Sequence, residues 1–199
     1  MSATPLTTTL RQSGAALRLL LALTVLLGVL YPLAITAAGQ LAAPGNANGS
    51  RIELAGRVAG SQLVAQPFDG PAWFQPRPSS AGADGYDTLS SGASNLGPNS
   101  EELAATIEER RAAYAALNGI PLAQVPADAL TASASGLDPE ISPANARLQA
   151  SRVARARGLA PAQVARIVDE HVKGRTLGLL GEERVNVVDL NLALERLKP

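Results

Sequence analysis

The chain has 199 residues, a formal net charge of zero and no cysteine. A neutral chain gives no electrostatic basis for binding nucleic acid or an anionic membrane surface, and with a single histidine it has too few ligands for a zinc site. Aromatic residues make up only 3% of the sequence, so its core must be built mainly from Val, Leu, Ile and Ala.

Residues 19–41 form the longest apolar segment and contain no charged residue. Because a helix of about 20 apolar residues spans the ~30 Å hydrocarbon core of a bilayer, we predict a transmembrane helix here. A cleaved secretory signal is the alternative, since Arg11 and Arg18 precede the segment. The apolar core of such a signal usually covers only ~7–15 residues, and this favours a retained anchor.

Some residues of this helix are candidates for packing against a partner helix. Small residues let helices approach closely in lipid, and a proline frees a backbone carbonyl that a neighbouring helix can satisfy. The candidates are Gly28, Tyr31, Pro32 and Gly39.

Basic residues set the expected orientation of the helix. Arg11 and Arg18 precede it and residues 1–50 contain no acid, whereas Arg51 and Arg57 after it are accompanied by Glu53. The positive-inside rule therefore places the N-terminus in the cytoplasm. The expected parts are a cytoplasmic tail (1–18), a membrane span (19–41), a flexible tether (42–51) and an extracytoplasmic domain (52–199).

The domain begins with short strands and a long loop. Apolar and polar residues partly alternate between residues 52 and 68, which predicts two short strands. Residues 71–98 are rich in Gly, Pro, Ser, Asp and Asn without a periodic apolar pattern, so we predict a long loop. Trp73, Phe74 and Tyr86 argue against disorder here, and a long ordered loop in a compact domain usually has a function.

Helices with strong end signals follow the loop. Ser100 predicts the start of a helix that ends at Gly119. Ser142, followed by proline, predicts the start of a second helix that ends at Gly158.

The C-terminal part of the chain predicts smaller elements. A third helix is expected from Pro161 to near Gly174, with His171 and Val172 on its apolar face. A strand is expected over residues 185–188, and a last short helix is capped by Asp189. The predicted fold class is therefore α+β, a mixed domain of several helices and short strands anchored by one N-terminal transmembrane helix.

No catalytic motif is apparent in this domain. His171 lies on an apolar stripe and is expected to be a core or interface residue, and residues 174–181 lack the lysine of a phosphate-binding loop. Ser133 and Ser135 lie close to Asp138, but no histidine stands nearby in the sequence to activate a serine.

Several loop segments and the C-terminal run, in this order behind one anchor, resemble the C subunit of the Kdp-type bacterial potassium-transporting ATPase. The resemblance covers nearly the whole chain, although Ala93 and Ala134 stand where the family often has glycine and Glu140 where it often has histidine. The segments are residues 60–68 (GSQLVAQPF), 73–79 (WFQPRPS), 89–99 (LSSGASNLGPN), 131–143 (TASASGLDPEISP) and 184–194 (RVNVVDLNLAL).

The resemblance implies an accessory subunit, without catalytic activity of its own, of an ATP-driven potassium pump in the bacterial inner membrane. The implied partners are a channel-like subunit, a P-type ATPase subunit and a very small membrane subunit. The complex uses ATP and Mg²⁺, and this chain is expected to bind no cofactor directly. In the family the C subunit is needed for assembly and is described as a catalytic chaperone that raises the ATP affinity of the ATPase subunit.

An outward-facing domain cannot meet cytoplasmic ATP, so we expect any effect on ATP use to be indirect. The alternative function is a free-standing, membrane-anchored periplasmic binding protein or hydrolase. Such a protein would show a pocket lined by convergent polar groups.

The two polar loops contain the candidate residues for partner contact or loop formation. Arg77, held between two prolines on a stiff extended stretch, is the first candidate for an exposed contact. A purely structural role is equally open, because Gly92, Gly97 and Gly136 can supply turns with positive φ and asparagine or aspartate can cap them. The full set is Arg77, Ser94, Asn95, Ser133, Ser135, Gly136 and Asp138.

Overall fold

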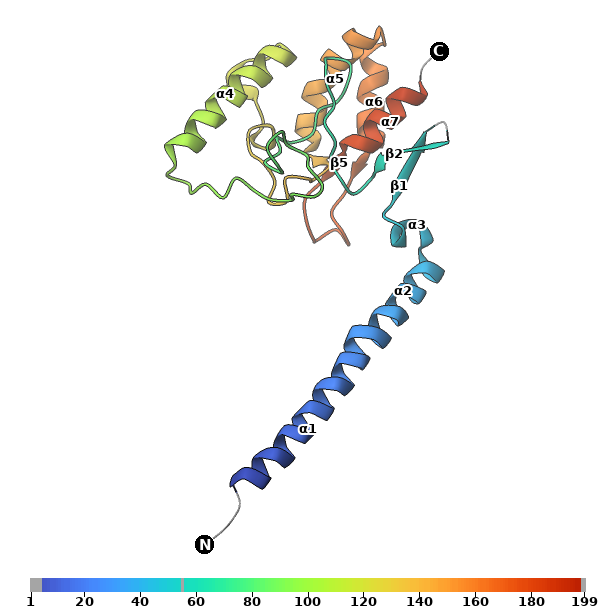
Figure 1. Cartoon of the computed structure of the whole chain (residues 1–199). Helices are drawn as coiled ribbons and strands as arrows, with labels where there is room; N and C mark the ends of the chain where they lie inside the picture. The colour runs from blue at the N-terminus through green and yellow to red at the C-terminus, as the bar shows by residue number, and fades with distance from the viewer. Residues whose placement is uncertain (1–4, 55, 198–199) are drawn as a thin grey trace. The chain divides into compact units, whose positions relative to one another are not determined.

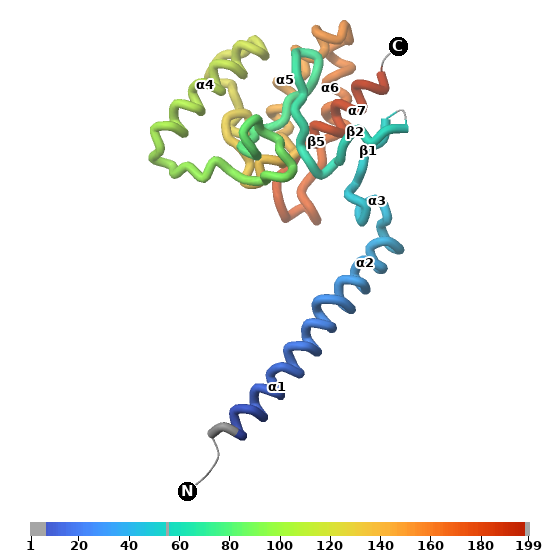
Figure 2. The backbone as a smooth tube through the Cα atoms, viewed as in Figure 1, coloured from blue at the N-terminus to red at the C-terminus, as the bar shows by residue number. Residues whose placement is uncertain are grey.

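The computed structural model describes residues 5–54 and 56–197, and the chain divides into two compact units, Met1–Ser50 and Arg51–Pro199 (Figure 1). The first unit is a long helix made of α1 (Pro5–Val25), the π-helical turn η1 (Leu26–Leu30) and α2 (Tyr31–Ala42), followed by the short helix α3 (Pro44–Ala47). Figure 2 traces the same path as a tube. Helix α3 lies within the segment predicted as a tether, and residues 5–18 of the predicted tail are helical.

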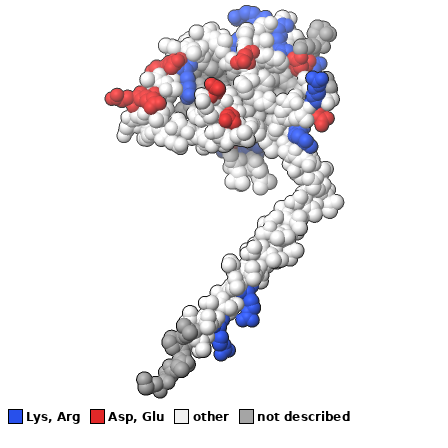
Figure 3. Space-filling model, viewed as in Figure 1, with Lys and Arg blue, Asp and Glu red and all other residues white. Residues whose placement is uncertain are grey.

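The first unit has the length and composition of a membrane anchor. Within Thr7–Ala42 an 18-residue window has a mean hydropathy of 2.3, and none of that window is buried by the rest of the chain. Charged side chains appear in Figure 3 only near the N-terminal end of this helix, where Arg11 and Arg18 lie. One N-terminal helix therefore anchors the chain in a membrane.

The π-helical turn has a local cause. Pro32 has no amide hydrogen, so the carbonyl of Gly28 loses its usual donor. The turn before the proline is wider than an α-turn, and the amide of Tyr31 donates to the carbonyl of Leu26, five residues earlier. Of the residues predicted to pack in the membrane, Gly28 thus lies in the widened turn, Tyr31 and Pro32 begin α2, and Gly39 lies further along α2.

The second unit combines helices with two small antiparallel sheets, which confirms the predicted fold class. The hairpin of β1 (Arg51–Leu54) and β2 (Arg57–Ser61) forms one sheet. The other has the strand order β3-β5-β4. The remaining elements in chain order are α4 (Glu101–Asn118), the 3-10 turns η2 (Leu122–Gln124) and η3 (Ala127–Ala129), β3 (Glu140–Ile141), α5 (Pro143–Arg157), α6 (Pro161–Glu170), β4 (Val172–Lys173), β5 (Arg184–Asn186) and α7 (Val187–Arg196).

The apolar core lies between α5, α6, α7 and β5. One aromatic ring, that of Phe74, enters it from the long loop and is fully buried. Burial of these side chains is the main favourable term in holding the unit together. The core residues are Phe74, Ile141, Ala146, Ala150, Val153, Ala154, Val164, Ile167, Val168, Val185, Val187, Leu190 and Leu194.

The predicted ends of two helices are confirmed. The Ser100 hydroxyl accepts a hydrogen bond from the Leu103 amide and begins α4, which ends at Gly119 with a φ of 66°. Ser142 begins α5 in the same way, and Gly158, also with a φ of 66°, ends it. The predicted long loop is confirmed as well, since residues 71–98 contain neither helix nor strand.

Two predictions near the C-terminus are wrong. Helix α6 ends at Glu170 rather than near Gly174, because Val172 leaves the helix and pairs with Val185 of β5. The predicted strand over residues 185–188 stops at Asn186, whose side chain accepts from the amides of residues 188 and 189 and caps α7 in place of Asp189.

Candidate functional site

The two polar loops, residues 71–98 and 131–139, lie against each other and are joined by hydrogen bonds. The Ser79 hydroxyl connects them, since it donates to the Gly136 carbonyl at 2.6 Å and accepts from the amides of Tyr86 and Ala81 at 2.7 and 3.1 Å. One side chain thus satisfies three backbone groups that have no strand or helix to pair with.

Tyr86 closes the turn that begins at Ser79. Its hydroxyl donates to the Arg77 carbonyl at 2.8 Å. Burial of the phenol raises the pKa of Tyr86 to about 12, and nearby Arg110 opposes this shift in part. The side chain therefore stays protonated at neutral pH and acts as a structural donor.

Gly136 is the point of closest approach between the loops. Its φ is +68°, and a Cβ atom placed on it would lie 2.6 Å from the Gly92 carbonyl oxygen and 2.8 Å from the Ala81 amide nitrogen. The neighbouring Ser135 carbonyl accepts from the Gly92 amide and from the Ser91 hydroxyl, both at 2.9 Å. Only glycine fits this position, both for its backbone angle and for its space.

Arg77 is less exposed than its prediction as an exposed contact implied. Its side chain is only 25% exposed and points to the second loop, where its guanidinium donates to the Thr131 and Ala132 carbonyls and lies 3.4 Å from the Asp138 carboxylate. The flanking prolines fix the backbone, but the unpaired carbonyls of the second loop determine where the side chain goes. Arg77 therefore links the two loops.

The serines and the aspartate of the second loop form turns. Ser133 is buried, and its hydroxyl lies 3.4 Å both from the Ser135 hydroxyl and from the Asp138 amide. The Asp138 carboxylate accepts from the Glu140 amide at 2.9 Å, which is an Asx turn. His171 is elsewhere, at the end of α6, with its Nδ1 atom 2.7 Å from the Ile167 carbonyl. The single histidine of the chain thus bonds within α6 and not to these serines.

Ser94 and Asn95 lie on the outer part of the first loop. Both are exposed, and Asn95 has a φ of 55°, a backbone region that asparagine tolerates better than most residues. Gly92 and Gly97 do not adopt such angles, although the sequence allowed for it. The loops thus present an exposed outer part on a base of largely part-buried hydrogen bonds.

A set of buried polar residues under the first loop was not predicted. Arg152 on α5 is 5% exposed and donates to the carbonyls of Pro71 and Trp73 at 2.6 and 2.9 Å and to the Gln149 side chain at 2.8 Å. Burial lowers the pKa of Arg152 below its usual value. The side chain of Asn191 on α7 accepts from the Phe74 amide and donates to the Phe74 carbonyl.

The sequence did contain a signal for part of this set. Asn145, Gln149 and Arg152 on α5 follow one another at the spacing of a single helix face, and all three are buried. A polar stripe on the buried face of a helix indicates that backbone from another segment needs partners there.

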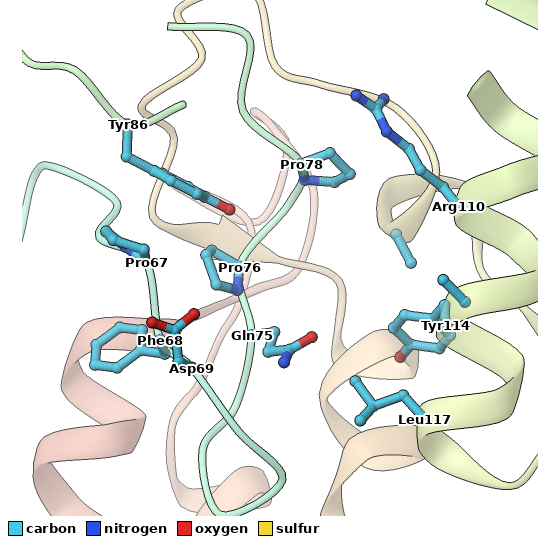
Figure 4. A pocket seen from close by; sticks show the side chains of 12 residues that line it. Pro67, Phe68, Asp69, Gln75, Pro76, Pro78, Tyr86, Arg110, Tyr114 and Leu117 are labelled. Carbon is cyan, nitrogen blue, oxygen red and sulfur yellow. The ribbon is translucent and has the colours of Figure 1, made fainter. Parts of the chain in front are cut away.

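A cavity of about 340 Å³ lies between the first loop and α4 (Figure 4). In Figure 4 Tyr86 lies with Pro67, Pro76 and Pro78 on one side of the cavity, and Arg110 and Tyr114 on α4 lie on the other. The polar ends of these side chains already have protein partners, because Tyr114 donates to Asn145 at 2.6 Å and Arg110 to the Leu130 carbonyl at 3.0 Å. The side chains of Asp69 and Gln75 also line the cavity, so its polar lining is not confined to the groups that bond within the protein.

A family model for the K+-transporting ATPase, c chain, matches residues 13–196 of this sequence. The chain is 55% identical over 194 residues to a protein of Kineococcus radiotolerans named potassium-transporting ATPase KdpC subunit, and the match covers 98% of each chain. Proteins of the same name from Mycobacterium bovis and Cereibacter sphaeroides are 52% and 53% identical, covering 94% and 90% of this chain and 99% and 94% of the relatives.

Proposed function

Since this chain belongs to the family of the c chain of K+-transporting ATPases, we propose that it helps to assemble its pump and raises the pump's ATP affinity indirectly, from outside the cytoplasm. As a member of this family the chain is a non-catalytic subunit of a potassium-transporting ATPase complex, anchored by one N-terminal helix. Its partners in the proposal are the channel-like subunit, the P-type ATPase subunit and a very small membrane subunit of the same pump.

The observation that carries the proposal is the rigid pair of loops. Ser79, Arg77 and Gly136 hold residues 71–98 and 131–139 in one arrangement although neither segment belongs to a helix or a long strand. A surface that is already ordered loses little conformational entropy when it binds. A rigid polar surface without a hydrolytic site suits a subunit that holds another protein in place.

The proposed orientation has the second unit outside the cytoplasm. It is supported by Arg11 and Arg18 before the apolar segment and by the lack of acids in residues 1–50. Alkaline phosphatase is active only when exported, so its fusion after Pro199 should give active enzyme in intact cells. Activity of a reporter that works only in the cytoplasm would contradict the orientation.

Because the proposed domain faces away from the ATP pool, its effect on ATP must pass through the membrane subunits. We therefore expect ATP and Mg²⁺ to be used by the complex and not to be bound by this chain. Equilibrium dialysis of radiolabelled ATP against the purified full chain in detergent should show no saturable binding, with the assembled pump as the positive control. Saturable binding to the chain alone would contradict an indirect effect.

The loops can be tested for direct contact with Asn95→Gly and Asp138→Ala. Asn95 is exposed and glycine adopts its φ of 55° freely, whereas Asp138 holds an Asx turn, so only the second variant should lower the melting temperature of the chain, by the equivalent of about 0.5–2 kcal/mol. If the loops contact a partner, Asn95→Gly should reduce co-purification of the pump while the chain itself melts normally. Unchanged yield and potassium uptake in both variants would remove the loops from the proposal.

The membrane helix supplies a second proposed contact. Gly28 lies in the widened turn and no heavy atom is nearer than 3.9 Å to the position of a Cβ there, so its surface is open to a partner helix. Gly28→Leu should weaken co-purification with the membrane subunits. Gly14→Leu, at an equally open position before the apolar segment, is the matched control and should have no effect.

A further inference from the structure

The loop between β4 and β5 carries an exposed group of leucines. Leu177, Leu179 and Leu180 are 87%, 80% and 63% exposed, and together they form a continuous apolar tip. In Figure 3 uncharged atoms project below the body of the domain at the position of this loop in Figure 1. Single exposed leucines are common on protein surfaces, but a cluster of large apolar side chains on one short loop indicates a binding surface.

The leucine tip is held in a defined conformation. The amide of Thr176 donates to the Leu180 carbonyl at 2.8 Å, and the amide of Leu180 donates back at 3.0 Å. Leu177 has a φ of 55°, which is uncommon for a leucine, and Arg175 and Glu182 form an ion pair at 2.8 Å across the base. The strained backbone angle of Leu177 thus belongs to a defined loop conformation in which the three leucine side chains are exposed.

The tip lies at the same end of the second unit as the start of β1. In Figure 1 the loop and the first residues of β1 both lie at the lower end of the second unit. Only residues 43–50 separate α2 from β1, and a chain of that length spans at most about 30 Å even when fully extended. Part of it is the helix α3, which shortens its reach. The start of β1 is therefore held within about 30 Å of the end of α2.

We propose that the leucine tip, Leu177, Leu179 and Leu180, inserts into the interfacial region of the lipid bilayer beside the anchor. A convex tip needs a matching cavity in a protein partner, whereas the boundary between headgroups and acyl chains accepts an apolar protrusion of any shape. At the base of the loop Arg175 pairs with Glu182 and Arg184 with Glu140, so these four charges reach the headgroup level as two neutral pairs. The exposed carboxylate of Glu183 lies beside them, at a depth where headgroups and water solvate it. The inference rests on the membrane anchor and not on the proposed role in assembly.

The absence of cysteine from the chain makes a direct test possible. Leu179→Cys and, as matched control, Leu89→Cys are each labelled with a nitrobenzoxadiazole fluorophore in the full chain. Leu89 is 97% exposed on the first polar loop and is an equally accessible position without the proposed insertion. Each labelled chain is reconstituted alone, without other pump subunits, into nanodiscs of phosphatidylcholine and phosphatidylglycerol.

The label at residue 179 should show blue-shifted emission, strong quenching by nitroxide groups on the lipid acyl chains and weak quenching by aqueous iodide. The label at residue 89 should show the opposite pattern. Leu177→Ser combined with Leu180→Ser, in the Leu179→Cys background, should move the label at 179 toward the pattern of the control. Equal iodide quenching at both sites would overturn the proposal, and so would shielding at 179 that appears only in the assembled pump, because the tip would then bind protein. Co-purification of the pump is measured separately, so a failure of the assembly role is distinguishable.

Discussion

The helical core and the paired loops of the second unit are both ordered, but for different physical reasons. In the core, apolar side chains of α5, α6 and α7 are removed from water and pack against one another. In the loops the ordering comes from side chains that hydrogen-bond to backbone, such as Ser79 to Gly136 and Arg152 to Pro71 and Trp73. Among the core residues that the structure describes, Phe74 alone belongs to both regions, since it lies in the loop sequence and its ring is part of the core.

This difference determines how each region responds to substitution. Apolar packing is non-directional and tolerates replacement by residues of similar volume. A loop whose backbone groups depend on individual side chains has no such tolerance, because each lost partner leaves a specific donor or acceptor without its hydrogen bond. The core should therefore determine global stability, and the loops should be sensitive at single positions while leaving the core intact.

The largest expected effect is that of Leu190→Ala in the core. Leu190 is fully buried between α7 and the other helices, and truncation of such a leucine costs about 2–5 kcal/mol because it leaves a cavity. Thermal unfolding of the full chain in detergent measures this loss. Leu122→Ala, at a position where the side chain is 55% exposed, is the control and should have little effect. Equal losses in the two variants would show that the core is not where stability resides.

Gly136→Ala should disturb the loops at a somewhat smaller cost, roughly 2–4 kcal/mol. The added methyl group meets the Gly92 carbonyl oxygen and the Ala81 amide, and the backbone angle is unfavourable for alanine. Hydrogen exchange should show faster exchange of the Gly92 amide, which bonds across the loops to Ser135, and of the Tyr86 amide, which bonds to the Ser79 hydroxyl, while amides of α5 remain protected. Gly92→Ala, which meets no atom within 4 Å, should leave exchange unchanged. Loss of protection in α5 as well would mean that loops and core unfold as one unit.

The parts of the fold that the sequence predicted are those with local causes. Two helices begin at Ser100 and Ser142 and end at Gly119 and Gly158. The hydrogen bonds and backbone angles that set these limits involve residues only a few positions apart, so they can be predicted without knowing the fold. Val172 could not be assigned in this way, because its strand exists only through pairing with Val185 of β5. A two-residue strand has too little sequence to show an alternating pattern.

The candidate loops were found from composition, but the direction of their side chains was not. Two prolines around Arg77 indicated a stiff and exposed presentation, whereas the acceptors that turn the guanidinium inward lie 54 and 55 residues further along the chain. The polar stripe of Asn145, Gln149 and Arg152 was readable as a periodicity, although the segment it serves was not. Local sequence patterns thus indicate that a polar side chain will hydrogen-bond to backbone groups, but only the fold shows which segment supplies those groups.

The smallest expected effect concerns Tyr86 at high pH and separates hydrogen bonding from packing in the loops. Burial raises the pKa of Tyr86 from 10.0 to about 12, so the folded state retains the phenolic proton more strongly than the unfolded state does. The stabilisation that follows is fully present below about pH 10 and is lost as the pH rises through about 12. Tyr86→Phe keeps the ring but loses the bond to the Arg77 carbonyl, at a cost of about 1 kcal/mol at neutral pH. Melting temperatures of both proteins, followed from neutral to alkaline pH, should therefore converge, since every other titrating group is common to both. A constant difference would mean that the hydroxyl contributes through packing alone, and the loops would then resemble the core more closely than their hydrogen bonds indicate.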